Sequence, residues 1–231
     1  MKRVLRTTLA AFLLFTTSLL VAAIPTTVTF HFERVGLSVP KFTLMVSEDG
    51  TGTYEADQIE IPSHGGTLRS QPAAHVQRAV SVTPATLTKL FALARIAQVF
   101  NTECASKAKN IADTGSKTLS YAGPDGAGTC AYNYTENKQV AALTELFQGI
   151  ATTMDEARRL DFIHRYDRLG LDAEMTSFAT QVDEGRALEL GNILPTLNSI
   201  VSDTELIQRV RLRAQKMMES VADFHQGGSV K

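Results

Sequence analysis

Residues 83–134 read TPATLTKLFALARIAQVFNTECASKAKNIADTGSKTLSYAGPDGAGTCAYNY, and the rest of the predicted architecture is built around them. Thr83-Pro84 is a typical helix start, because the hydroxyl can cap free amides and proline is tolerated at the first helical position. Apolar residues then recur at helical spacing: Leu87, Leu90, Phe91 and Ala94. The spacing predicts a helix that ends near Phe100.

After this helix the stretch turns into two short strands around a glycine-rich turn. We expect strands over 116–122 and 129–135, joined by the turn Gly123–Gly128. The chain has two cysteines, Cys104 in the loop and Cys130 in the second strand. In an oxidising compartment such a pair is expected to form a disulfide, although two separate thiols remain the alternative. Closing this loop would stabilise the fold by roughly 3.5 kcal/mol.

The residues before this stretch alternate between apolar and polar side chains, which is typical of half-buried strands. Residues 28–33 form one predicted strand, and 41–61 form a hairpin that turns at Asp49-Gly50-Thr51-Gly52. Residues 63–74 contain Gly65-Gly66 and Pro72 and predict a loop. Residues 76–82 predict a further strand.

From Asn137 onward the apolar period is helical. A long helix is predicted to run to about Leu169, a second is predicted to be capped by Asp172, and a third is bent or restarted at Pro195. The sequence Ser202-Asp203-Thr204-Glu205 is a capping box in front of the last helix, which reaches about Phe224. Strands followed by helices indicate an α+β protein: antiparallel hairpins packed with a helix in the N-terminal half, and an antiparallel helical bundle in the C-terminal half.

We therefore expect four segments along the chain. Residues 1–23 form a signal peptide, with Lys2, Arg3 and Arg6 before an apolar run that closes on Val21-Ala22-Ala23. Residues 24–136 form the strand-rich region, 137–225 a helical region packed on it, and 226–231 a flexible tail. The apolar run is short for a membrane span, so cleavage is expected over retention as an anchor, with no membrane span afterwards.

Removal of residues 1–23 would leave 20 basic and 24 acidic residues, a net charge of −4. This balance argues against a nucleic acid partner, which needs a basic face. Together with the signal peptide expected over residues 1–23, the sequence predicts a periplasmic or secreted protein.

One short motif could carry catalysis. Residues 111–116, Ile-Ala-Asp-Thr-Gly-Ser, resemble the active-site signature of aspartic proteases, in which two aspartates share a proton and activate water. Here the motif occurs once, so a second copy of the chain would have to supply the other aspartate. The apolar pair before a glycine that the family carries downstream is also missing. The alternative interpretation is a polar turn that leads into the strand after Gly115.

Other residues give no firm site. The five histidines are dispersed, and no spacing of cysteine or histidine predicts a metal. The turn at 123–128 lacks the lysine and the helix of a phosphate-binding loop, so no cofactor is expected. The histidines are His31, His64, His75, His164 and His225.

Tyr121, Tyr132 and Tyr134 could form a binding face, but packing toward the helix over 84–100 is favoured. The basic run in the last helix indicates a solvated helix face or a contact with an acidic partner. It consists of Arg209, Arg211 and Arg213.

Residues 82–154 resemble an uncharacterised domain of unknown function found in exported bacterial proteins. The resemblance rests on the helix start at Thr83-Pro84, an aspartate before a strand, a glycine-bearing hairpin and a helix that begins near Gln139. It implies the α+β fold and names no catalytic residue. We expect a non-catalytic binding or accessory module of the cell envelope, with an unknown protein or envelope ligand as partner. The alternative is a hydrolase that uses Asp113.

Overall fold

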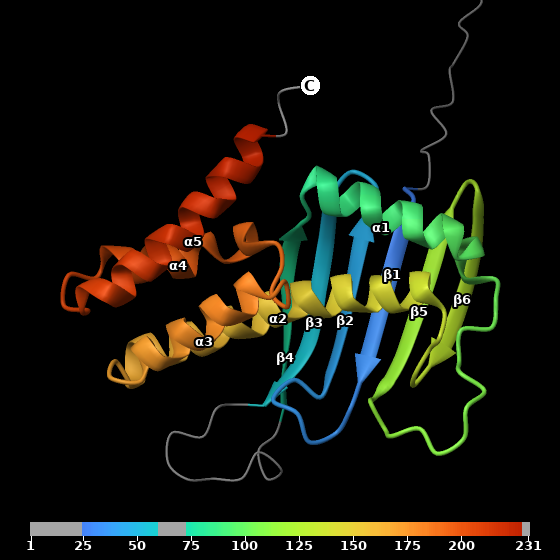
Figure 1. Ribbon diagram of the computed structural model, residues 1–231, viewed down its shortest axis with the longest axis horizontal. Coiled ribbons are helices and arrows are strands. Elements are labelled where there is room, and N and C mark those ends of the chain that lie inside the picture. The colour runs from blue at the N-terminus through green and yellow to red at the C-terminus, as the bar shows by residue number, and fades with distance from the viewer. Residues whose placement is uncertain (1–24, 60–72, 228–231) are drawn as a thin grey trace, which may run out of the picture.

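The computed structural model describes residues 25–59 and 73–227, with side chains as far as residue 222. It contains a six-stranded antiparallel sheet with the strand order β4-β3-β2-β1-β5-β6 (Figure 1). Helices make up the C-terminal half, so the predicted α+β class is confirmed. The strands are β1 Thr27–Glu33, β2 Lys41–Ser47, β3 Thr51–Ile59, β4 Ala73–Ser81, β5 Ser116–Gly123 and β6 Gly126–Tyr132.

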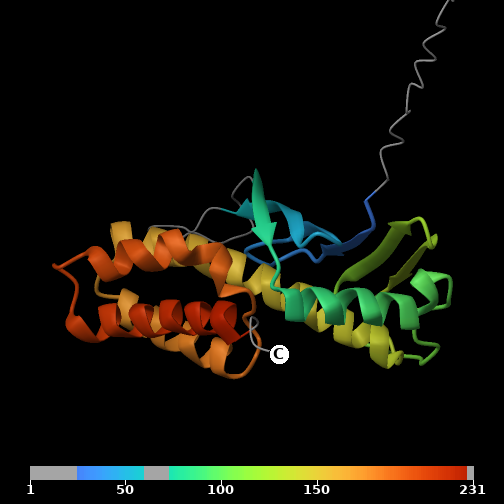
Figure 2. The ribbon, with the colours of Figure 1, turned by 90° about the horizontal axis from the view of Figure 1, so that it is seen from above.

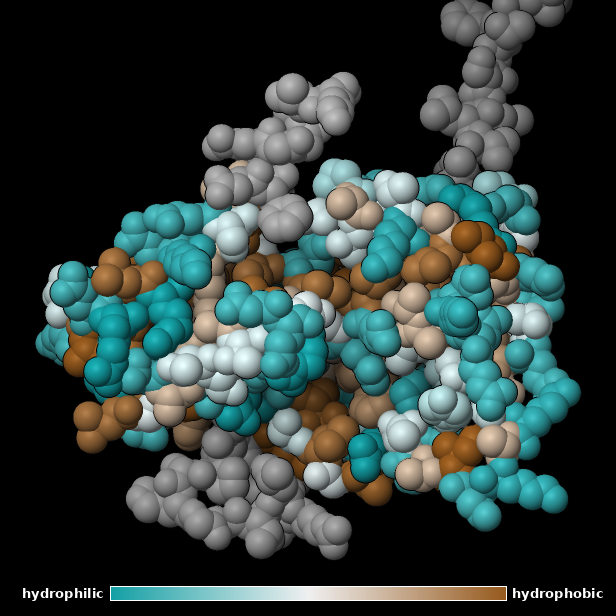
Figure 3. Space-filling model, in the orientation of Figure 1, coloured by the Kyte–Doolittle hydropathy of each residue, from teal (hydrophilic) through white to brown (hydrophobic). Residues whose placement is uncertain are grey.

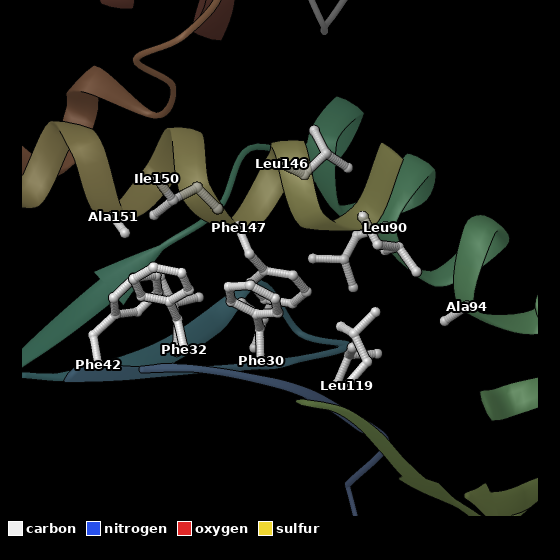
Figure 4. Close-up of a cluster of buried hydrophobic side chains, with 14 of the residues drawn as sticks. Phe30, Phe32, Phe42, Leu90, Ala94, Leu119, Leu146, Phe147, Ile150 and Ala151 are labelled. Atoms are coloured by element: carbon white, nitrogen blue, oxygen red, sulfur yellow. The ribbon is translucent and has the colours of Figure 1, made fainter. Parts of the chain in front are cut away.

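One face of the sheet is apolar because each strand alternates. Val28, Phe30 and Phe32 are buried on β1, while the residues between them are partly exposed. The helices α1, Pro84–Ile96, and α2, Lys138–Tyr166, both lie on this face (Figure 2). Phe30 stacks on Phe147 of α2 with 5.3 Å between the ring centres (Figure 4). The sheet and the two helices thus enclose the first hydrophobic core.

Helix α1 begins where the sequence predicts and ends four residues earlier than expected. The cause is a left-handed turn, since Gln98, Val99 and Phe100 all have positive φ. This turn, η2, Gln98–Phe100, lies against β6, and a Cβ at Gly128 would collide with the Val99 carbonyl oxygen. Gly128 is therefore a strand residue that lets η2 approach, and the predicted six-residue turn shrinks to Pro124-Asp125.

A disulfide joins Cys104 to Cys130, with 5.8 Å between the Cα atoms. It links the loop after η2 to the edge strand β6. Both cysteines are buried in the first core.

Helix α2 is 29 residues long and connects two cores. Its first half, to Met154, packs on the sheet, and from Ala157 onward it packs in a second core with the C-terminal helices. These helices are α3 Leu171–Asp183, η3 Leu190–Ile193, α4 Leu194–Ser202 and α5 Gln208–Gly227.

None of the three side-chain caps expected from the sequence, at Thr83, Asp172 and residues 202–205, holds the amides of its helix. The Thr83 hydroxyl donates to Glu189 instead. Helix α2 has a cap that was not predicted. Asn137 caps α2, since its Oδ1 accepts from the amides of Gln139 and Val140. Asp172 lies inside the first turn of α3, where its carboxylate binds arginines of α5 in place of capping amides. The expected capping box falls in the loop after α4, where Asp203 accepts from the Glu205 amide, and α5 begins later, at Gln208.

Three predicted segments lie outside the described residues: the C-terminal end of the first hairpin, most of the 63–74 loop, and the signal segment. Within the described part, the strand expected over 76–82 begins three residues earlier, at Ala73.

Candidate functional site

A cavity of about 460 Å³ lies where the sheet half meets the helical bundle. One wall is the β4–α1 junction, and the other comes from the end of α3, η3, the start of α4 and α5. Figure 3 shows hydrophobic surface in the hollow between the bundle, at the left, and the sheet half, at the right. We call this cavity the junction pocket. Its lining is mainly aliphatic and includes Val82, Val182, Leu188, Leu190, Leu194 and Val221.

The rim of the junction pocket is held by a hydrogen-bonded glutamate. Glu189 reaches Thr83, whose backbone amide and hydroxyl donate to its two carboxylate oxygens, each over 2.8 Å. Thr83 is the residue before α1, so the carboxylate lies at the positive end of that helix, where a negative charge is favoured. Glu189 has φ +59, a left-handed conformation that non-glycine residues adopt only at a cost of about 1 kcal/mol or more.

A second contact closes the same junction. The side-chain amide of Asn192 accepts from the Ser81 backbone amide over 2.7 Å and donates to the Ser81 carbonyl over 2.9 Å. It therefore pairs with the end of β4 as a neighbouring strand would. Together with Glu189, it fixes the η3 segment against the sheet half and so sets the width of the pocket.

A groove between α3 and α5 lies next to the junction pocket. This groove, of about 470 Å³, shares Val182 and Ser220 with the pocket. Ala179, Leu212 and Met217 add apolar surface, and Asp183 and Lys216 stand exposed along it. Arg213 also lines the groove, where its guanidinium binds Asp172.

A pair of glutamates lies in the interface between α2 and α3. Glu156 is 8% exposed, and burial raises its pKa to about 7. Hydrogen bonding to Arg159 lowers the pKa of Glu174, with 2.8 Å between Arg159 Nε and Glu174 Oε1. Gln181 donates to Glu156 Oε1, and Glu156 Oε2 has no hydrogen-bond partner among the described residues. The pair does not line the junction pocket.

Asp113, the candidate catalytic residue, lies in a turn of its own. Its Oδ1 accepts from the Gly115 amide over 2.9 Å, and its side chain is exposed. The same turn surrounds a buried lysine: Lys117 Nζ donates to the carbonyls of Thr114, Gly115 and Asn133 at 2.8–3.0 Å. In the described structure, no hydrogen bond joins Asp113 to a second carboxylate.

Three of the five histidines can be placed, and they are far apart in different elements. His31 bonds to Thr43, His75 to Asp57 and His164 to Asp203. His64 and the side chain of His225 lie outside the described residues. Over the described ranges, no group of three histidine, cysteine, aspartate or glutamate side chains gathers as metal ligands would.

The tyrosines and arginines mostly serve internal packing. Tyr121 and Tyr132 are buried, with Tyr121 edge-on to Phe91 as expected, whereas the Tyr132 hydroxyl meets Thr144 of α2. Tyr134 lies past the end of β6 and is exposed.

The arginines that share one side of α5, Arg209 and Arg213, both bind Asp172 of α3, so their acidic contact lies within the chain.

The comparisons with known proteins give no family. No family model matches the chain, and no curated protein matches its sequence. In the described part of the chain, no helix combines the length and apolar character that a membrane crossing needs.

Sequence reasoning missed the junction pocket. Glu189 and Thr83 are 106 positions apart, and neither stands in a motif that predicts a contact. The only local signal was the helix start at Thr83-Pro84, which leaves an amide and a hydroxyl available to an acceptor.

Proposed function

We propose that the protein is a non-catalytic binding module of the cell envelope that holds a small apolar ligand in the junction pocket. The observation that carries the proposal is the aliphatic lining of this pocket at the meeting of two cores. Ligand sites favour such concave, mostly apolar positions between structural units, with a few polar groups at the rim. Thr83 and Glu189 satisfy each other at that rim, so an apolar ligand would leave no buried polar group unpaired.

Placement outside the cytoplasm is part of the same proposal. It is supported by the basic and apolar pattern of residues 1–23 and by the buried disulfide, which oxidising compartments favour. The resemblance of residues 82–154 to exported bacterial domains agrees with it and assigns no chemistry. Cleavage after Ala23 would leave Ile24 as the first residue, which N-terminal sequencing of the secreted material checks.

A single introduced tryptophan tests the pocket, because the chain has none. In Leu194→Trp the indole would stand in the pocket wall, and we expect the dye anilinonaphthalene sulfonate to quench its emission along a saturating curve. The matched control is Tyr166→Trp, at the exposed end of α2, which should give no saturable change. Equal behaviour of both variants, or no quenching in either, would contradict a ligand site in the pocket.

The alternative function, a hydrolase that uses Asp113, has no supporting contact within the described residues. It would require a partner copy to place a carboxylate beside an exposed turn in which Asp113 already accepts a hydrogen bond from the Gly115 amide. The Asp113→Asn variant tests it, because loss of a hydrolytic activity at unchanged stability would establish the hydrolase.

A further inference from the structure

We infer that the ligand of the junction pocket is a single unbranched acyl chain, lying through the pocket and along the groove between α3 and α5. This inference rests on the proposed function and adds the chemical class of the ligand.

The chemistry of the lining points to an aliphatic ligand. The described residues that line the pocket and the groove include no phenylalanine, tyrosine or tryptophan. The sheet core holds a cluster of rings around Phe30, Phe42 and Phe147, and Phe178 is buried in the bundle core without lining either cavity. A planar aromatic ligand can bind there through apolar contact, as the dye is expected to, but would find no ring for offset or edge-on stacking. An acyl chain needs only aliphatic contact, which valine, leucine and methionine side chains supply.

The shape of the site points to a long and narrow ligand. Pocket and groove lie next to each other and share the lining residues Val182 and Ser220, so a chain that fills the pocket can extend past Val182 toward Leu212 and Met217 of the groove. A rounded ligand would occupy the pocket alone and leave the groove open.

The charges at the open groove allow a polar head to stay in solvent. Lys216 and Asp183 are both exposed there and are of opposite sign. At the rim of the pocket, the carboxylate of Glu189 accepts hydrogen bonds from Thr83. Affinity should therefore come from the chain, with little contribution from the charge of the head.

The test is a series of straight-chain alkanoates, octanoate, decanoate and dodecanoate, titrated by calorimetry into the purified protein. Each buried methylene should strengthen binding about fourfold, so each two-carbon step should lower Kd by about an order of magnitude. Dodecanol should bind within a fewfold of dodecanoate. At about a hundredfold excess over its Kd, dodecanoate should raise Tm by about 5–10 °C.

A glycine in the pocket wall provides the blocking variant. A Cβ at Gly191 would meet Val221 Cγ1 at 3.7 Å, an ordinary contact, so Gly191→Leu should place its side chain in the pocket without moving the backbone. We expect it to weaken dodecanoate binding at least tenfold. Ala173→Leu, on the exposed face of α3, is the control and should bind as the parent does. If Gly191→Leu does not fold, Val182→Phe replaces it at the join of pocket and groove.

The outcomes separate the two proposals. If the dye quenches the Leu194→Trp variant while alkanoates do not bind, or bind without dependence on chain length, the acyl chain is excluded and the pocket remains a ligand site. If neither dye nor alkanoate binds, both proposals fail.

Discussion

The ammonium group of Lys117 is buried, and none of the carboxylates that the structure describes forms an ion pair with it. Lys117 is 5% exposed, and burial lowers the pKa of its side chain. The cost of desolvating a charge is offset by the carbonyl oxygens of Thr114, Gly115 and Asn133 and by the Thr114 hydroxyl. Gly115 has φ +94, and a Cβ there would press into the Phe32 ring at 2.7 Å. The Asp-Thr-Gly-Ser sequence therefore has a structural use, which is to wrap a lysine.

Substitution of Lys117 should lower stability, whereas substitution of Asp113 should leave it nearly unchanged. Lys117→Met removes the donor that several buried oxygens share, and we expect the free energy of unfolding to fall by about 2 kcal/mol. Asp113→Asn keeps an oxygen that can accept from the Gly115 amide, so its effect should stay within about 0.5 kcal/mol. Urea unfolding measures both. A measurable hydrolytic activity that Asp113→Asn abolishes at unchanged stability would instead establish the hydrolase.

Among single residues, the sequence predicts well where the signal is local. The start of α1 at Pro84 was predicted, because proline at the first helical position is a local signal. The role of Glu189 was not, because its left-handed conformation and its bonds to Thr83 depend on how η3 meets β4. The capping role expected of Asp172 was wrong because Arg209 and Arg213, on another helix, compete for its carboxylate.

The interface of α2 with α3 contains a charge that folding disfavours. Burial raises the pKa of Glu156 from its usual 4.5 to about 7, since the carboxylate is desolvated and lies beside Glu174. A raised pKa means that the fold binds this proton more tightly than the unfolded chain does. The stabilisation is complete below about pH 4.5 and is lost as pH rises through about 7.

Glu156→Gln should remove this pH dependence. The amide stays neutral, so the variant should be more stable than the parent at pH 8, by about 2 kcal/mol, and near it at pH 5. Urea unfolding at the two pH values provides the measurement, with Glu145→Gln, exposed on the same helix, as control. An equal shift for Glu156→Gln at both pH values would show that Glu156 is not protonated in the fold.

Elements were predictable in kind and less so in extent. The strands of the sheet follow from their alternation, and the C-terminal helices follow from their period. The end of α1 was missed because η2 is left-handed, and the β5–β6 turn was drawn too long because the glycines were assigned to the turn. Gly128 is in fact needed where β6 passes Val99. Glycine in a strand marks a close approach that no local pattern specifies.

At the level of the molecule, neither the strand order nor the junction pocket could be predicted from the sequence. Pairing of β1 with β5 joins residues about 90 positions apart, and the pocket forms between segments more than 100 positions apart. Such contacts depend on the packing of the two cores against each other. The apolar stripe of α2 from Val140 to Ala157 is buried within the chain.

The route of α2 through both cores has a consequence for unfolding. Met154 is the last residue of α2 in the sheet core, and Ala157 is its first residue in the bundle core. Less than one helical turn therefore separates the two cores along α2. A helix with buried side chains at both ends cannot lose its packing in one core and keep its hydrogen bonds unaffected in the other. The pocket contacts of Glu189 and Asn192 add a second link. We therefore expect sheet and bundle to unfold as one cooperative unit.

Leu160→Ala tests this coupling from the bundle side. Leu160 is fully buried in the bundle core, and its truncation should cost about 2–5 kcal/mol. With one cooperative unit, the slowest-exchanging amides of β1 and β5 should lose as much protection in native-state hydrogen exchange as those of α3 and α5. Asp161→Ala, on the exposed side of the same turn, should leave both sets unchanged. Loss confined to the bundle would instead mean that the two cores open separately, and then the junction pocket would lie on a boundary able to open without global unfolding.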